Sequence, residues 1–251
     1  IYWMVATSFK LDREMYTARA TLIPHQPTIK QYASLLAETP YLAQFRNSLI
    51  VATGTAVLAM LAGGLAAYSI ARLNFVGRRL WARALIVSYL VPPTVLFIPL
   101  YKLLQDFNLV NSRFGLILAD LTLTVPFCTW LLLAYFKTVP FELEEAALLD
   151  GCSRLGALVR ITLPLSAPAF VVVALFAFTL AWNEFLYAVV FTSDPYVQPV
   201  TAGLTSLTAE DVFFWGKMMA ASTLSVVPPV LLYFVSQRWV VRGLAMGALK
   251  G

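Results

Sequence analysis

The sequence of 251 residues has little charge: only 12% of its residues are Asp, Glu, Lys or Arg, whereas 60% are hydrophobic. Because a soluble domain carries roughly a quarter charged residues, this composition excludes a soluble fold and predicts a polytopic membrane protein. Histidine and cysteine are also scarce, with one and two residues. His25 alone cannot build a His-rich metal site or a Ser/His catalytic pair, so neither is expected. Cys128 and Cys152 lie in very different settings, which excludes a disulfide framework.

Sequence patterns for nucleotide and nucleic-acid binding are missing as well. No Gly-x-x-x-x-Gly-Lys string is present, so ATP must be bound elsewhere, and no catalytic residue, metal or cofactor is expected in this chain. The net charge of +5 does not indicate a nucleic-acid partner, since membrane proteins collect Lys and Arg in their cytoplasmic loops. Gly/Ser linkers and convincing repeats are absent too, which predicts one membrane domain over residues 48–237.

Hydrophobic runs long enough to cross a bilayer, about 20 residues, occur five times. They cover residues 48–70, 84–101, 114–136, 161–183 and 218–237. Pro164 and Pro168 indicate that the fourth helix begins near Pro168, and it can continue to about Phe191. Further prolines interrupt the other spans, namely Pro92, Pro93, Pro126, Pro228 and Pro229. Two explanations of these prolines stay open: they form kinks at which the helices bend during transport, or they serve static packing.

The ends of the chain and its orientation follow from composition. Residues 1–9 begin apolar but are too short to cross a bilayer, and we interpret them as the outer end of a truncated first helix. Residues 10–47 are expected to be extracytoplasmic, with a surface helix near 28–37, and residues 238–251 to form a cytoplasmic tail. The side that holds the loop 137–160 and this tail carries ten basic residues, against eight on the other side. The positive-inside rule therefore places this loop and the C-terminus in the cytoplasm.

The loop 137–160 contains a predicted short helix. Pro140 can open it, because its missing N–H is not needed in the first turn. Three acidic residues then lie near the positive end of the helix dipole: Glu142, Glu144 and Glu145. Gly151 can end the helix in a left-handed conformation, and a second short helix is expected over residues 153–160. Two interpretations stay open at this point: a solvated connecting helix, and a surface that another protein approaches closely.

The spacing in and after this loop matches the EAA motif, which is typical of the permease subunits of binding-protein-dependent ATP-binding-cassette (ABC) importers. The matching residues are Glu145, Ala146, Ala147, Gly151, Ile161, Leu163 and Pro164. Other stretches resemble the maltose- and glycerol-phosphate-type permeases of this class: Asn47-Ser48, Ala67-Tyr68, Ala71-Arg72, Trp182-Asn183-Glu184-Phe185, and a tail from Arg242 to Gly251. The resemblance implies an all-α, type I ABC importer permease fold of six transmembrane helices, the first truncated in this chain.

The resemblance also implies roles and partners. Residues 137–164 would form the coupling loop, which docks into a cleft of the ATPase subunit, with Glu145 as the polar anchor, Ala146 and Ala147 as the close-contact face, and Gly151 as the turn. Asp150, Ile161, Leu163 and Pro164 complete the expected set. The implied partners are a second homologous permease subunit, two ABC ATPase subunits that bind ATP and Mg, an extracytoplasmic solute-binding protein and the lipid bilayer of a bacterial or archaeal plasma membrane.

The resemblance further implies uptake of a sugar or a related polyol or glycerol-phosphate-type solute by ATP-driven alternating access. The tail would extend towards the ATPase dimer interface. The loop 192–217, which includes Asp194, Glu210 and Asp211, would face the binding protein.

Polar residues at membrane depth are functional candidates. Asn183 and Glu184 either line the translocation path or pair across helices, whereas Asp120 fits a structural role better. Tyr187 could stack on a sugar, although aromatic side chains also fill cores. The span interiors contain no Lys or Arg, which favours a neutral or polyol-like solute, but the partner permease could supply the binding site. A self-contained secondary transporter or channel is the alternative function, and it would not need a coupling loop.

Overall fold

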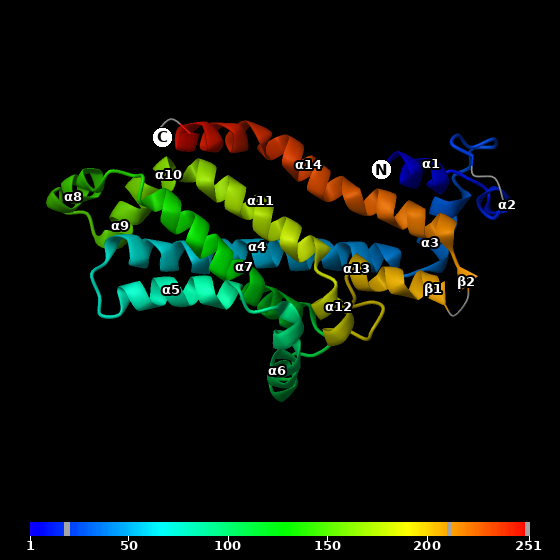
Figure 1. The fold of residues 1–251 in the computed structure, drawn as a ribbon, viewed down its shortest axis with the longest axis horizontal. Helices are drawn as coiled ribbons and strands as arrows, with labels where there is room; N and C mark the ends of the chain where they lie inside the picture. The colour runs from blue at the N-terminus through cyan, green and yellow to red at the C-terminus, as the bar shows by residue number, and fades with distance from the viewer. Residues whose placement is uncertain (18–20, 210–211, 249–251) are drawn as a thin grey trace. The chain divides into compact units, whose positions relative to one another are not determined.

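The computed structural model describes residues 1–17, 21–209 and 212–248, with the backbone alone at 209, 212–213 and 240–248. This part of the chain is almost entirely helical (Figure 1). In chain order the helices are α1 Tyr2–Ser8, α2 Asp12–Met15, α3 Lys30–Glu38, α4 Tyr41–Arg72, α5 Arg78–Tyr89, α6 Pro93–Asp106, α7 Arg113–Phe136, α8 Phe141–Leu149, α9 Arg154–Ala157, the π-helix Leu158–Thr162, α10 Leu163–Leu165, α11 Ala167–Asn183, α12 Leu186–Phe191, α13 Val200–Gly203, the 3₁₀-helix Leu204–Leu207 and α14 Trp215–Ala248.

One small β-element interrupts the helical architecture. Strands β1 Thr208–Ala209 and β2 Val212–Phe213 pair antiparallel, with Thr208 opposite Phe213. The sequence did not predict this hairpin, because two-residue strands are too short to show an alternating pattern.

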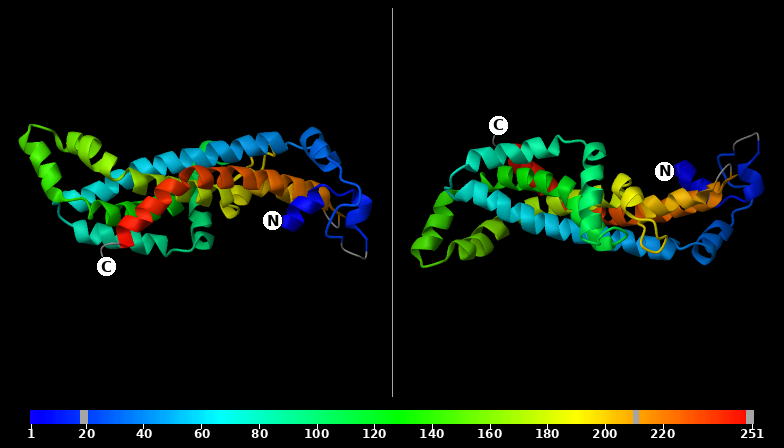
Figure 2. Two further views of the ribbon diagram at one scale, coloured as in Figure 1. Left: turned by 90° about the horizontal axis from the view of Figure 1, so that it is seen from above. Right: turned by 90° about the horizontal axis from the view of Figure 1, so that it is seen from below.

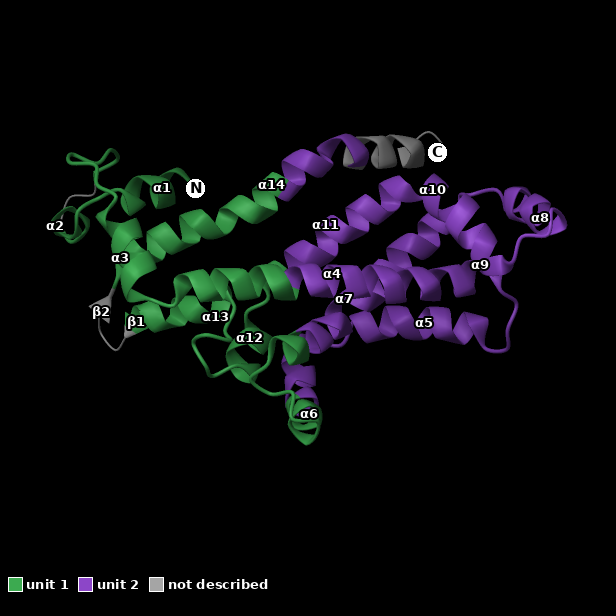
Figure 3. Cartoon of the chain, turned by 180° about the vertical axis from the view of Figure 1, so that it is seen from behind, with its two compact units in different colours: residues 1–51, 101–116, 182–231 green, residues 52–100, 117–181, 232–251 purple. Residues whose placement is uncertain are grey.

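The chain divides into two compact units, coloured separately in Figure 3. Unit 1 comprises residues 1–51, 101–116 and 182–231. In its core α3 packs on the start of α4 and on α14 through Leu35, Tyr41 and Ala221. The Tyr41 hydroxyl also donates a hydrogen bond to the Ala221 carbonyl (2.9 Å). The helix that was expected on the surface near residues 28–37 is therefore α3, half-buried in this core.

Unit 2 comprises residues 52–100, 117–181 and 232–251. Its helices α4 and α7 approach closely at Gly63, where a Cβ atom would lie 3.1 Å from Cβ of Cys128 and 3.2 Å from the backbone nitrogen of Thr129. Small residues allow such backbone approach in a membrane, where packing rather than the hydrophobic effect joins helices. Helix α8 lies at one end of this unit in all three views of Figures 1 and 2.

Three of the five predicted spans are single helices in the structure, and the other two correspond to pairs of helices with a sharp bend between them. In the described residues, α4, α7 and α14 are each long and apolar enough to cross a membrane, and the number of spans rises to five if each of two bent pairs is one span. The run 84–101 is divided into α5 and α6, which meet at 102°. Pro92 and Pro93 lack the N–H groups that would continue α5, while Pro93 suits the first turn of α6.

The second bent pair consists of the segment 154–165 and α11, which meet at 81°. Helix α11 begins at Ala167, next to the predicted start at Pro168. At the other end of the chain, α14 runs on through residue 237 to Ala248, so the expected tail continues this helix. The side chains of the tail residues 240–251 lie outside the described part of the structure.

Candidate functional site

Helix α8 has the termini that its sequence predicts. It follows Pro140, whose extended conformation (φ −56°, ψ 132°) leads directly into the helix. At its end, the N–H of Gly151 donates to the Leu148 carbonyl (3.1 Å) and the N–H of Cys152 to the Ala147 carbonyl (2.9 Å). These two bonds form a Schellman motif, which needs a left-handed residue. Gly151 supplies it with φ +85°, as predicted.

The first half of the EAA motif forms an exposed surface. Glu145, Ala146, Asp150 and Gly151 are exposed, and Ala147 is partly buried. Beside them, the Leu149 side chain is 89% exposed. A surface that combines small residues, a carboxylate and an uncovered leucine is suited to contact with another protein.

The second half of the motif packs into unit 2. Ser153 caps α9 by accepting a hydrogen bond from the Gly156 N–H (3.1 Å). The π-helix that follows carries Ile161, which is partly buried, and α10 carries Leu163 and the exposed Pro164. Leu163 lines an apolar pocket of about 420 Å³ together with Phe170. The motif therefore links an outward surface to packed helices.

A buried polar cluster joins α8 to the spans, and its acidic residue is Glu144, not Glu145. The Arg72 Nε lies 2.8 Å from Glu144 Oε1, and the two side chains are only 7% and 3% exposed. Tyr68 donates its hydroxyl to Glu144 Oε2 (3.0 Å), and Thr162 donates to Oε1 (2.6 Å). The carboxylate of α8 is thus held by α4 and by the π-helix.

Arg72 extends this cluster to the end of α7. Its Nη2 donates to the carbonyls of Phe136 (2.9 Å) and Val139 (2.8 Å), and its guanidinium lies 5.5 Å from the ring centroid of Phe141. A buried ion pair is tolerated when hydrogen bonds satisfy its polar groups, and here both Glu144 oxygens and the Nε and Nη2 groups of Arg72 are hydrogen-bonded. Sequence reasoning assigned Glu144 only to the helix dipole. The sequence feature that could have indicated a buried partner for Glu144 is the pair Tyr68 and Arg72. These two residues are four positions apart and hence lie on one face of α4.

The polar residues expected on a translocation path are placed differently from one another. Asn183 is exposed at the end of α11. Glu184 caps α12: its carboxylate accepts hydrogen bonds from the N–H groups of Tyr187 (2.9 Å) and Ala188 (3.0 Å). Tyr187 is fully buried, with its ring stacked on Phe191 at 5.1 Å. Asp120, in unit 2, is also buried. Among the described residues, Glu184 therefore bonds to the neighbouring backbone and not across helices, Tyr187 and Asp120 are buried, and Asn183 is the exposed residue of the four.

Asn47 and Ser48 hold the loop that was expected to face a binding protein. Asn47 Nδ2 donates to the carbonyls of Tyr196 (2.7 Å) and Gln198 (3.0 Å), and Ser48 Oγ accepts from the Val200 N–H (2.8 Å). Both side chains are buried, so this short motif fixes the loop on α4. Glu210 and Asp211 lie outside the described residues. Within the described part, no group of three His, Cys, Asp or Glu side chains is placed to hold a metal ion.

Comparisons with known proteins identify the class. Residues 59–246 match the family described as "Binding-protein-dependent transport system inner membrane component". The chain is 35% identical over 250 residues to the inner membrane ABC transporter permease protein YcjP of Escherichia coli, covering 99% of this chain and 89% of that protein. It is 36% identical to the sulfoquinovosyl glycerol transport system permease protein SmoH of Agrobacterium fabrum (99% and 87%). With the trehalose/maltose transport system permease protein MalG of Thermococcus litoralis the identity is 34% (99% and 90%).

The fold agrees with this class. The structure resembles a bacterial ABC transporter involved in the import of the acidic polysaccharide alginate, with a TM-score of 0.80 and 20% identity over 95% of this chain and 89% of that one. The chain belongs to the family of inner-membrane permease subunits of binding-protein-dependent ABC importers. It is a non-catalytic, multi-pass membrane component of such an importer.

Proposed function

We propose that this chain forms half of the translocation pore for a sugar or a related polyol or glycerol-phosphate-type solute, and that it works by ATP-driven alternating access. The names of its relatives support the solute class, since they include permeases for trehalose/maltose, diacetylchitobiose and sulfoquinovosyl glycerol. The other half of the pore would be a second homologous permease. The complete fold would be the type I arrangement of six transmembrane helices, with residues 1–9 as the outer end of the first.

The observation that carries the mechanism is α8, which exposes its EAA surface while Glu144 is fixed to Arg72 inside unit 2. In this proposal α8 docks on one of two ABC ATPase subunits, which bind ATP and Mg. Glu145 and Asp150 supply the polar contacts, and Ala146 and Ala147 allow close approach. When the ATPases close, α8 moves, and the buried pair transmits this motion to α4 and α7.

The orientation and the solute path belong to the same proposal. Loop 137–164 and the C-terminus would lie in the cytoplasm, and the loop 192–217, held by Asn47 and Ser48, would face the extracytoplasmic binding protein. Asn183 has the exposed amide that could hydrogen-bond a passing hydroxyl group, with Glu184 positioning the chain beside it. The partner permease would supply further contacts.

Binding-protein-stimulated ATP hydrolysis by the reconstituted complex tests the coupling role. Glu145→Lys and Gly151→Asp place charge or bulk on the exposed surface and leave the buried cluster intact, so stimulated hydrolysis and transport should fall to the unstimulated level. Asp106→Lys is the matched charge reversal on an exposed residue at the end of α6, and it should retain stimulation. If stimulation survives both α8 changes, the loop is only a connector, and a self-contained carrier becomes the better hypothesis.

A further inference from the structure

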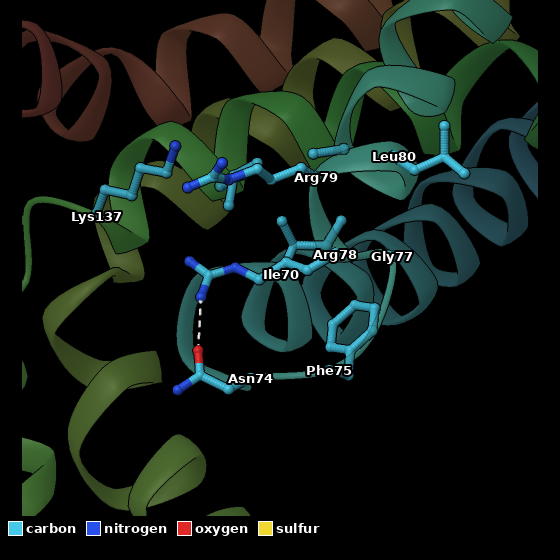
Figure 4. A pocket seen from close by; sticks show the side chains of 10 residues that line it. Ile70, Asn74, Phe75, Gly77, Arg78, Arg79, Leu80 and Lys137 are labelled. Atoms are coloured by element: carbon cyan, nitrogen blue, oxygen red, sulfur yellow. Dashed lines mark hydrogen bonds between the residues drawn. The ribbon is translucent and has the colours of Figure 1, made fainter.

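A basic pocket lies in unit 2, separate from the exposed EAA surface. Its volume is about 640 Å³, and it is lined by the end of α4, the segment that leads into α5, the first turns of α5 and the end of α7 (Figure 4). Three cationic side chains line it: Arg78, Arg79 and Lys137. No acidic residue is among its described lining residues. This imbalance suits an anionic ligand.

The three cations have no carboxylate to neutralise them. None of the three ion pairs in the described part of the chain includes them. Arg78 is held in place by donating to Asn74 Oδ1 (3.1 Å) and to the Ala71 carbonyl (3.4 Å), which are neutral acceptors. In Figure 4 the charged ends of Arg79 and Lys137 extend towards the same part of the pocket. Like charges that converge repel each other, and an anion between them removes this cost.

The backbone adds to the positive potential. Helix α5 begins at Arg78 after Gly77, whose φ is +84°, and it has neither a side-chain cap nor an acidic residue in its first turn. The N-terminus of a helix is a partly positive end that favours anions. Two arginines at this end are unfavourable unless a negative group neutralises them.

The surroundings indicate which anion. Phe75 and Leu80 line the pocket beside the charges, and both are exposed, as is the neighbouring Trp81. Apolar side chains exposed next to a basic pocket suit a ligand that carries both a phosphate and acyl chains. The loop 73–80 also belongs to the side that the charge bias assigns to the cytoplasm, where anionic lipids attract clusters of Lys and Arg.

We infer that this pocket binds the phosphodiester headgroup of an anionic phospholipid in the cytoplasmic leaflet. Arg79 and Lys137 contact the phosphate oxygens, Arg78 contributes a third positive charge fixed by Asn74, and the acyl chains lie along the exposed apolar side chains of α5. The site thereby fixes the start of α5 relative to the end of α7. This assignment does not depend on the solute or on the coupling role of α8.

The test is native mass spectrometry of the complete importer in detergent, titrated with phosphatidylglycerol or phosphatidylcholine. Arg79→Gln/Lys137→Gln should weaken phosphatidylglycerol binding at one site by about 25-fold, on the basis of roughly a fivefold effect for each cation. Arg79→Lys/Lys137→Arg keeps both charges and should retain most of the binding. Arg46→Gln/Lys102→Gln removes the same charge from two exposed residues of unit 1 and should bind like the wild type. Phosphatidylcholine should not distinguish the four proteins.

Three outcomes would overturn the inference. Equal losses in the Arg79/Lys137 and Arg46/Lys102 variants would show that only total charge matters. Unchanged phosphatidylglycerol binding in the Arg79/Lys137 variant would show that the pocket is not the site. Displacement of the lipid by millimolar inorganic phosphate would assign the pocket to a soluble phosphate instead.

Discussion

Two adjacent glutamates of α8 have opposite environments, and this difference determines what each can do. Successive residues of an α-helix point about 100° apart. Glu144 therefore points into unit 2, where it meets Arg72, while Glu145 remains exposed. An exposed carboxylate is available to a partner, and a paired, buried one is not. The EAA motif names only the second glutamate, so its position next to an internal anchor becomes visible only in the structure.

Breaking the buried pair should cost far more stability than removing it. Arg72→Met or Glu144→Met leaves one buried charge without its partner, and each should destabilise the protein by about 3 kcal/mol or more. The double variant should be less destabilised than either single variant. Thermal unfolding of the purified protein in detergent measures this difference. Additive losses in the double variant would contradict a coupled pair.

Substitutions of Glu184 and Asn183 should separate effects on stability from effects on transport. Glu184→Ala removes the acceptor for two N–H groups of α12 and should cost about 1 kcal/mol or more of stability, as the loss of a helix cap does. Asn183→Ala removes an exposed polar side chain of the proposed solute path, so it should raise KM for transport. Equal thermal stability of wild type and Glu184→Ala would exclude the capping role. An unchanged KM in Asn183→Ala would exclude Asn183 from the solute path.

At the scale of elements, the end of α8 depends on backbone conformation alone. A Cβ atom at Gly151 would have no neighbour within 4 Å, so space does not limit the residue type there. The backbone angle φ of +85° is what limits the residue type at this position. Left-handed conformation costs an ordinary L-residue roughly 1–2 kcal/mol, and asparagine tolerates it better than alanine.

Gly151→Ala should therefore reduce binding-protein-stimulated ATP hydrolysis more than Gly151→Asn, although alanine is the smaller residue. The measurement is the stimulated rate of the reconstituted complex, with Gly64→Ala in α4 as the control, because this glycine lacks a positive φ and a Cβ atom there would make an ordinary contact of 3.4 Å with Phe170. If asparagine were the more harmful replacement, side-chain size at the docking surface would be the determinant instead of backbone conformation.

The spans could be predicted from composition, but their bends could not. Apolar runs located α4, α7 and α14 because a bilayer requires about 20 such residues. Pro92 and Pro93 marked an interruption, yet the 102° angle there depends on what α5 and α6 pack against, which one sequence does not contain. The π-helix over Leu158–Thr162 was expected as an ordinary short helix, since one additional residue per turn leaves no clear hydrophobic pattern.

At the scale of the whole molecule, labelling can test how the chain is oriented in the membrane. Val76 and Leu149 are among the most exposed side chains of the loops assigned to the cytoplasm, and Leu22 is exposed in the opposite segment. In a Cys128→Ala/Cys152→Ser background, a membrane-impermeant thiol reagent should label Leu22→Cys in right-side-out vesicles. It should label Val76→Cys and Leu149→Cys only in inverted vesicles. The reverse pattern would overturn the proposed topology.

The site was predictable where it depends on local spacing and unpredictable where distant segments meet. The EAA motif and Gly151 lie within a short stretch, so their arrangement on α8 could be derived from helix geometry. Glu144 could not be distinguished from Glu145, because its partner Arg72 lies at the end of another span. Likewise, Asn47 and Ser48 were noticed by resemblance, while their contacts to the loop 192–217 are known only from the structure.

The pair between Arg72 and Glu144 also has a consequence for how the protein is made. Ribosomes synthesise Arg72 72 residues before Glu144, and Thr162 emerges 18 residues later still. During synthesis Arg72 is therefore made well before its carboxylate partner, with the whole of α7 between them in the chain. The contacts that hold α8 are thus complete only after Thr162 has been made, and before α11 and α14 follow, so a chain that ends ahead of the π-helix lacks part of this anchor.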